Sequence, residues 1–248
     1  MMDVYNGGVR KETLIITCEH GGNAVPAAYA ALFSGHELLL ETHRGWDPGA
    51  LELAGQMARE FDAPLYAATI TRLLIDLNRS IGHKDLYSLV TRNLPQATRH
   101  EIVAVHYRPH RDLVEAEVAC RVAAGERVFH LASHSFTPEL DGVQRQADVA
   151  WLYDPRRNGE KMLASRWLAA LKRRRPDLKL RRNYPYEGRD DGLMSLLRKR
   201  YPRELYVGIE LEVNQRFVFE GGAVWAALRR DVVDSFADLR EPPGACTV

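Results

Sequence analysis

Stretches of mostly apolar residues alternate along the chain with segments that repeat apolar residues at helical spacing. A short, continuous apolar run is typical of a strand buried on both faces of a parallel sheet. Such runs predict strands at 14–18, 64–75, 127–136, 148–153 and 205–213, with a weaker one at 178–182. Helical spacing predicts helices near 48–61, 113–119, 161–172, 192–201 and 223–239.

Strands that alternate with helices, without an internal repeat or a linker, favour one α/β domain. We therefore expect a single domain over residues 1–248, with its core at about 12–240. The expected architecture is a mostly parallel, mixed sheet flanked by helices on both faces.

Polar residues stand at the ends of four predicted strands, where a buried strand should stay apolar. They are His20, the segment 76–79, His134 and Glu210. In open α/β sheets, ligands bind beyond the carboxyl ends of the strands. These positions are therefore the first candidates for a functional site.

Side chains alternate between the two faces of a strand, which groups the polar residues further. In 127–136, His130 and His134 share one face, and His134 is the one at the strand end. In 205–213, Glu210 and Glu212 share a face opposite the apolar positions. Carboxylates seldom lie inside a protein unless they are paired, metal-bound or functional. The alternative for this glutamate pair is the solvent side of an edge strand.

Two imidazoles and a carboxylate, with water in the fourth position, form a common catalytic zinc site. His20 and His134 are the candidate imidazoles. For the third ligand, Asn23 has suitable spacing from His20 but is a neutral amide. Asp47 is the acidic candidate, although Trp46–Pro48 also resembles a helix start with Asp47 as its N-cap.

Composition indicates an ordinary globular protein, with 46% hydrophobic and 27% charged residues. Lys and Arg (34) nearly balance Asp and Glu (33), so no overall field favours nucleic acid or an anionic membrane as a partner. The basic run at 172–175 precedes Pro176 and is expected to end a helix, where cations are favourable.

Three widely spaced cysteines without a CxxC motif indicate a reducing compartment. No stretch resembles a signal peptide or a membrane span. A cytoplasmic location is therefore expected, whereas the oligomeric state is not indicated by the sequence.

A set of short motifs, in order across about residues 14–216, resembles the N-formylglutamate amidohydrolase family. The motifs are CEHGGNAVP, WDPGA, TRLLIDLNRS, SHSF, DVAWLYD, NYPYEG and GIELEVNQ. That family is related to the zinc carboxypeptidases and to the succinylglutamate desuccinylase and aspartoacylase group. The resemblance implies their fold and a zinc-dependent hydrolase that cleaves the linear amide of an N-acyl amino acid, N-formylglutamate above all.

The resemblance also implies roles for individual residues. His20 and His134 match the two histidine ligands of one Zn²⁺, and Glu210 matches the general base. Asn78 and Arg79 match the pair that binds a substrate carboxylate. The wider group has a ligand glutamate where this chain has Asn23, and Asp47 is the match for the aspartate that serves instead.

Three further residues are candidates for substrate binding. Arg72 either binds a second substrate carboxylate or is a surface strand residue. Tyr186 and Arg189 either close over the substrate or belong to a Pro-rich surface turn. The expected partner is a small N-acyl amino acid that carries a carboxylate.

Two other functions are compatible with the sequence. Cys18 could be the nucleophile of a cysteine-dependent amidase, but His20 lies two residues along the strand, about 6.6 Å away, too far for direct contact. A non-catalytic domain that binds a metabolite or a protein is the second alternative, and Asn23 in place of the ligand glutamate supports it.

Overall fold

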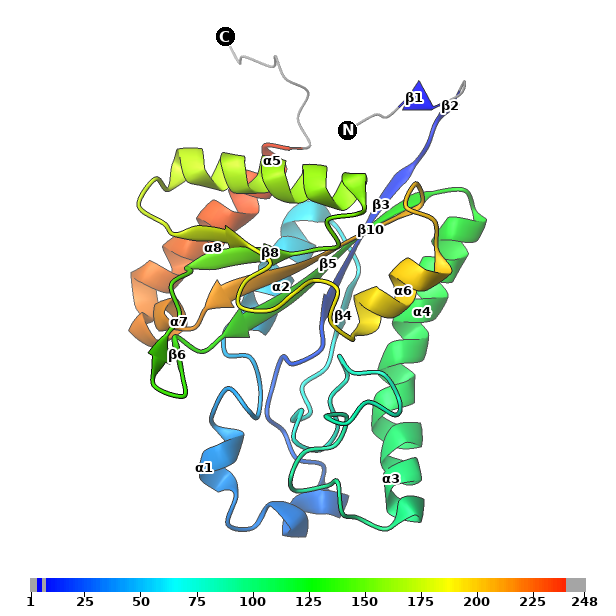
Figure 1. Ribbon diagram of the computed structural model, residues 1–248, viewed down its shortest axis with the longest axis vertical. Coiled ribbons are helices and arrows are strands. Elements are labelled where there is room, and N and C mark those ends of the chain that lie inside the picture. The colour runs from blue at the N-terminus through cyan, green and yellow to red at the C-terminus, as the bar shows by residue number, and fades with distance from the viewer. Residues whose placement is uncertain (1–3, 6–7, 240–248) are drawn as a thin grey trace.

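A six-stranded mixed sheet forms the centre of the molecule in the computed structural model, which describes residues 4–5 and 8–239 (Figure 1). The strand order is β4 (Leu65–Ala67), β3 (Glu12–Cys18), β5 (Arg127–Phe136), β10 (Tyr206–Asn214), β8 (Val149–Leu152) and β9 (Leu180–Arg182). The first four strands run parallel, β8 pairs antiparallel with β10, and β9 runs parallel to β8. The predicted fold class, a mostly parallel mixed sheet, is confirmed.

Helices cover both faces of this sheet. On one face, the main apolar core joins the sheet to α2 (Ala50–Phe61), α5 (Asn158–Arg174) and α8 (Gly222–Ala237). On the other face, a smaller cluster joins it to α4 (Arg108–Ala123) and α6 (Leu193–Arg200).

The alternation predicted for β10 is observed. Val207, Ile209 and Leu211 point into the main core, whereas Tyr206 belongs to the cluster beneath α4 and α6. Glu210 and Glu212 share the face of Tyr206 but lie nearer the carboxyl end of the strand. Strand β10 lies between β5 and β8, so it is an interior strand of the sheet. The alternative of an edge strand with one solvent-facing side is therefore wrong.

The segment after β4 differs from the prediction. A strand was expected over 64–75, but only Leu65–Ala67 joins the sheet as a strand. The following chain runs irregularly, and Leu74, Ile75 and Leu77 are buried in a separate apolar cluster. That cluster also includes residues of the 3₁₀ segment Ala27–Phe33 and the end of α3 (Gln96–Ile102). Helix α3 lies in the lower half of the molecule in Figure 1. The apolar residues of this cluster made an irregular segment resemble a strand.

The remaining elements are short and lie mostly away from the sheet. A π-helical turn at Val103–Tyr107 connects α3 to α4. The others are α1 (Glu37–Leu40), α7 (Arg216–Glu220), and the hairpins β1 (Val4–Tyr5) with β2 (Gly8–Val9) and β6 (Glu139–Leu140) with β7 (Val143–Gln144). Among the described residues, every helix is too short or too polar to span a bilayer.

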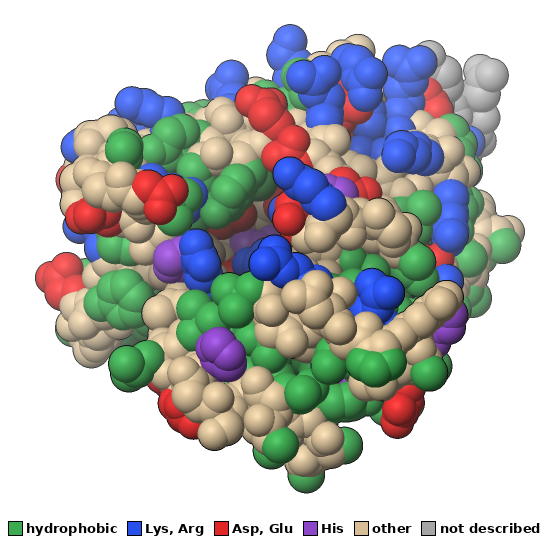
Figure 2. Space-filling model, turned by 60° about the horizontal axis from the view of Figure 1, so that its bottom comes forward, with side chains coloured by type: hydrophobic (Ala, Val, Ile, Leu, Met, Phe, Trp, Pro, Cys, Tyr) green, Lys and Arg blue, Asp and Glu red, His purple; other side chains and the backbone are tan. Residues whose placement is uncertain are grey.

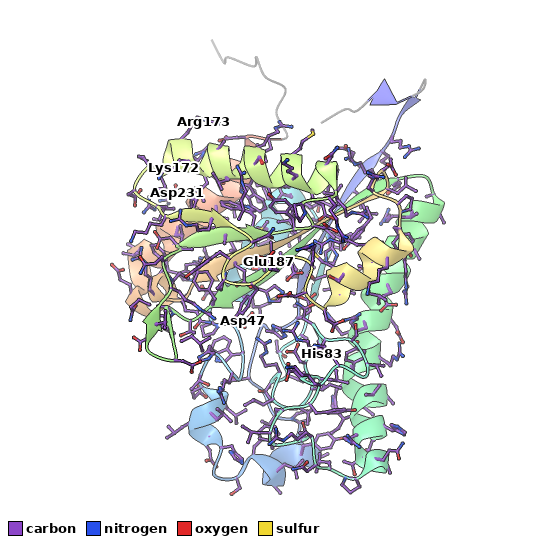
Figure 3. The ribbon with its side chains drawn as sticks, viewed as in Figure 1. Asp47, His83, Lys172, Arg173, Glu187 and Asp231 are labelled. Carbon is purple, nitrogen blue, oxygen red and sulfur yellow. The ribbon has the colours of Figure 1, made fainter. Side chains whose placement is uncertain are left out.

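The basic run at the end of α5 lies away from Asp47, as the labels of Lys172 and Arg173 show in Figure 3. The Lys172 ammonium donates to the carbonyl oxygens of Pro176 and Leu178. Arg175 pairs with Asp177 and Asp231. The run lies at a helix end, as expected, and Lys172 and Arg175 have local partners.

Candidate functional site

A cavity of about 110 Å³ opens at the carboxyl ends of β3, β5 and β10 (Figure 2). Most of its lining is polar. Its lining residues include His20, Asp47, Arg72, Asn78, Arg79, His134, Tyr186, Glu210 and Glu212. Residues from distant parts of the sequence therefore meet at the edge of the sheet where a ligand was expected.

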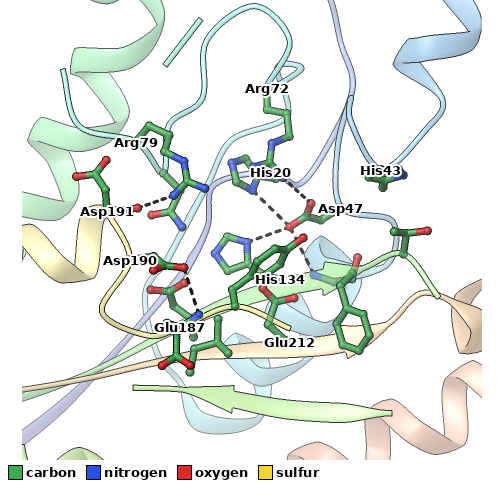
Figure 4. A pocket seen from close by; sticks show the side chains of 17 residues that line it. His20, His43, Asp47, Arg72, Arg79, His134, Glu187, Asp190, Asp191 and Glu212 are labelled. Carbon is green, nitrogen blue, oxygen red and sulfur yellow. Dashed lines mark hydrogen bonds and ion pairs between the residues drawn. The ribbon is translucent and has the colours of Figure 1, made fainter. Parts of the chain in front are cut away.

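Three buried side chains converge within this cavity (Figure 4). Asp47 Oδ2 lies 2.9 Å from His134 Nδ1 and 3.4 Å from His20 Nδ1. All three residues are at most 4% exposed, and one ligand atom from each lies within 4.8 Å of the others. Two nitrogens and one carboxylate oxygen thus face a common point.

Asp47 is held there by the turn before α2 and does not cap that helix. The N-cap is Gly49, with φ 81°, and no side chain bonds to the helix start. A Cβ at Gly49 would lie 2.5 Å from the Val218 side chain, so only glycine fits this turn. The expectation of an Asp47 cap is wrong, because the Asp47 carboxylate is directed to the histidines instead.

The second nitrogen of each imidazole also faces a buried carboxylate. His20 Nε2 lies 2.8 Å from Asp76 Oδ1, and His134 Nε2 lies 3.2 Å from Glu19 Oε2. Burial alone would lower the pKa of His134, but Asp47 and Glu19 outweigh burial and raise it well above its usual value. Burial would raise the pKa of Asp47, yet the neighbouring imidazoles and Arg72 lower it. The carboxylates in this group are therefore ionised at neutral pH.

This group fits a divalent metal ion of the zinc type. Ligand atoms bound about 2.1 Å from zinc in a tetrahedron lie about 3.4 Å apart, which is near the spacing of the Nδ1 and Oδ2 atoms here. Both histidines carry a carboxylate on the nitrogen that faces away, as metal-bound histidines commonly do. Asn23 is not part of the group, since its amide donates to Leu40 O and Glu41 Oε1.

Arg72 lies beside His20, Asp47 and His134 and forms ion pairs with two carboxylates. Its guanidinium donates to Asp47 Oδ1 at 3.3 Å and to Asp76 Oδ2 at 2.8 Å. Burial would lower the pKa of Arg72, but these two acids raise it. Arg72 is thus neither a strand residue nor a free surface cation.

Arg79 and Asn78 line the cavity, and Arg79 lies on the side away from Asp47 (Figure 4). Arg79 donates to the backbone carbonyl of Asp191 at 2.5 Å, and its Nε has no hydrogen-bond partner. Asn78 Oδ1 accepts from the backbone N–H of Leu193 at 2.9 Å. Arg79 therefore keeps donors for an anionic ligand, while Asn78 holds the start of α6 against this segment.

Glu210 and Glu212 project into the same cavity from β10. In the parallel register, Glu212 is the direct neighbour of His134, and Glu210 is the neighbour of Ala132. Burial raises the pKa of both, that of Glu212 to about 8. Glu212 Oε2 is buried without a hydrogen-bond partner. A carboxylate in this state can bind or release a proton readily near neutral pH.

Tyr186 and Arg189, the two loop residues predicted to contact the substrate, lie in different places in the structure. Tyr186 lines the cavity at its rim and accepts hydrogen bonds from the Arg145 guanidinium at 3.3 Å. Arg189 is exposed and lines a neighbouring recess with Asp154 and Ser195. The structure does not bring Arg189 into the cavity of His20 and His134.

Cys18 has no surroundings that would activate a thiol. Its side chain is fully buried in the main apolar core, and burial raises the pKa of the thiol well above its usual value. A nucleophilic cysteine needs a lowered pKa or an adjacent base. The cysteine-dependent alternative therefore lacks support in this geometry.

Glu19 is a residue of this site that the sequence analysis did not single out. Its carboxylate is 1% exposed and lies next to His134. The sequence offered one indication that Glu19 belongs to the site: it is a second polar residue, directly before His20, at the end of an apolar strand. That indication does not reveal which histidine such a carboxylate contacts.

Comparison with known proteins places this chain in a family. The N-formylglutamate amidohydrolase family model matches residues 12–219, which confirms the resemblance drawn from the motifs. Among solved structures, gene product Atu2144 from Agrobacterium tumefaciens is similar, with a TM-score of 0.75 and 27% identity over 94% of this chain and 93% of that one. The N-formylglutamate amidohydrolase from Ralstonia eutropha JMP134 shares the fold, with a TM-score of 0.65 and 20% identity over 96% of each chain.

No match was found among curated proteins. The family match nevertheless covers most of the chain and every residue of the candidate metal group. This chain belongs to the N-formylglutamate amidohydrolase family.

Proposed function

We propose that this protein is a metal-dependent amidohydrolase that cleaves the linear amide bond of an N-acyl amino acid, with N-formylglutamate as the first substrate to test. The observation that carries the proposal is one cavity in which His20, Asp47 and His134 converge opposite the free donors of Arg79. A metal group beside a cation suits a substrate that carries both an acyl carbonyl and a carboxylate.

His20, Asp47 and His134 are proposed to hold one Zn²⁺. When bound, zinc polarises a carbonyl and lowers the pKa of a coordinated water to about 7. Hydrolysis breaks the C–N bond, adds hydroxide to the acyl carbon, and requires a proton for the leaving amine. A carboxylate in the cavity is needed to move that proton.

Glu210 is the proposed general base, as the resemblance implies. Glu212 is a second candidate for the same role, because it is the register neighbour of His134 and has a buried oxygen without a partner. Either residue takes a proton from the attacking water and passes it to the nitrogen of the leaving amine. The positive charge of the metal would keep such a carboxylate ionised despite its burial.

Arg79 is proposed to bind the substrate carboxylate through its planar guanidinium, with Asn78 positioning that segment. Arg72 and Tyr186 are proposed to contact the remainder of the substrate, Arg72 while it stays paired with Asp76. Arg189 stays a proposed contact that would require its loop to move toward the cavity. A cytoplasmic location remains part of the proposal, and the free thiols of Cys18 and Cys120 are compatible with it.

A hydrolysis screen over N-formyl, N-acetyl and N-succinyl amino acids, with and without added zinc, tests the proposal. We expect amine release from at least one carboxylate-bearing substrate, loss of activity with a chelator, and recovery with zinc. Tight binding of such compounds without amine release, at any metal concentration, would favour the non-catalytic alternative.

A further inference from the structure

A buried carboxylate lies on the side of His134 that faces away from Asp47. Glu19 Oε2 is 3.2 Å from His134 Nε2, and Glu19 Oε1 is 4.0 Å from Nε2 of His110 on α4. Neither oxygen of Glu19 forms a well-aligned hydrogen bond. The carboxylate therefore stands between two imidazoles.

Keeping a carboxylate in the interior is costly unless its charge is compensated. Several other buried carboxylates in the described chain pair with an arginine, as Glu160 does with Arg198 and Arg157, although Glu212 does not. Among the described residues, Glu19 forms ion pairs with His110 and His134 alone. The location of Glu19 is therefore explained best by an effect of its carboxylate on the imidazole of His134.

The two candidate histidine ligands have the same arrangement around their rings. Each presents Nδ1 to Asp47 and Nε2 to a second carboxylate, Asp76 for His20 and Glu19 for His134. An acceptor at Nε2 fixes the proton there, which leaves the Nδ1 lone pair free for a metal. The carboxylate also increases the basicity of the ring as a ligand.

We propose that Glu19 is a positioning residue that holds His134 in the Nε2–H tautomer, so that Nδ1 is the metal-binding atom. The inference rests on the proposed metal site. Glu19 itself does not touch the substrate or the metal. His110 Nε2 lies 4.0 Å from the other oxygen of Glu19, on the side of α4.

Zinc affinity of the full chain, measured by competition with a chromophoric chelator at pH 7, tests the proposal without assaying activity. We expect Glu19→Gln to weaken zinc binding about 10- to 100-fold, since the charge is lost while the shape is kept. Glu19→Ala should weaken zinc binding further.

The matched control is Glu126→Gln, another acid in the interior, which pairs with Lys11 far from this cavity. It should bind zinc as the wild-type protein does. A purely structural role for Glu19 would change the melting temperature of the metal-free protein and leave the zinc affinity of the folded protein unchanged. That pattern would overturn the proposal.

A second measurement needs no variant. Long-range ¹H–¹⁵N spectra of the zinc-loaded wild-type protein report which nitrogen of His134 carries the proton. We expect protonated Nε2 and metal-bound Nδ1. Metal-bound Nε2 would overturn the positioning role alone, whereas a wild-type protein that binds no zinc would overturn both this proposal and the proposed function.

Discussion

The imidazole rings of His20 and His134 lie with their centroids 5.2 Å apart and are inclined by 56°, with Asp47 bonded to both. One ring follows the end of β3, and the other stands near the end of β5. The parallel pairing of these two strands fixes their relative position. Two rings that are held this way by the sheet need little rearrangement to share one ion.

The first prediction distinguishes the two candidate bases. Substituting the general base with glutamine, at either Glu210 or Glu212, should lower turnover by about 10²- to 10⁴-fold while zinc stays bound. Glu210→Gln tests the proposed assignment, and Glu212→Gln is its matched control on the same face. Loss confined to Glu212→Gln would transfer the role to Glu212. Normal turnover in both variants would contradict a base on β10.

Substrate binding by Arg79 gives the second prediction. Arg79→Ala should raise KM for carboxylate-bearing substrates by roughly 10- to 100-fold, because a hydrogen-bonded charge pair contributes about 1.5–3 kcal/mol. Arg189→Ala is the informative comparison. A similar rise in KM there would mean that the 186–191 loop moves over the substrate, and an unchanged KM in Arg79→Ala would exclude its proposed role.

His130 gives a prediction on pH. It is fully buried, lies 2.9 Å from Thr17 Oγ1 and 2.8 Å from the Tyr206 hydroxyl, and burial lowers its pKa from 6.5 to about 4. The unfolded state therefore binds the proton more readily, and the stability contributed by neutral His130 is lost as pH falls from 6.5 to 4.

At pH 5 this loss amounts to about 2 kcal/mol of unfolding free energy. Urea unfolding of the wild-type protein and His130→Gln, at pH 7 and pH 5, measures it. The stability difference between the two proteins should shrink by that amount at the lower pH. A difference that does not change with pH would mean that His130 has the same pKa in the folded and unfolded states, which would contradict its burial as a neutral residue.

Cys18→Ala is the fourth prediction. We expect full turnover and a loss of about 1–2 kcal/mol in stability, since the change removes a buried sulfur from the main apolar core. Cys18→Ser should be less stable than Cys18→Ala, because it buries a hydroxyl there. Lost turnover in a folded, zinc-bound Cys18→Ala protein would restore the cysteine-dependent alternative.

Much of the fold was predictable because the strands are strongly patterned. The run 127–136 forms β5 with the predicted bounds, and the shared face of Glu210 and Glu212 follows from simple alternation. The irregular chain after β4 was not predictable, since Leu74 and Ile75 are as apolar as strand residues but pack in a separate cluster.

The site was predictable where residues end strands, as His20 and His134 do. Asp47 illustrates the limit. Its sequence neighbours fit a helix start, but its carboxylate contacts His20 and His134, which lie on other segments of the chain. Glu19 contacts a histidine on another strand, and no local pattern encodes such a pairing.

Anomalous X-ray diffraction at the zinc edge, from crystals of the zinc-loaded protein, tests the central claim most directly. We predict one strong peak about 2.0–2.2 Å from His20 Nδ1, His134 Nδ1 and Asp47 Oδ2. The absence of a peak at these three atoms, in a protein that is otherwise folded as described, would contradict the account.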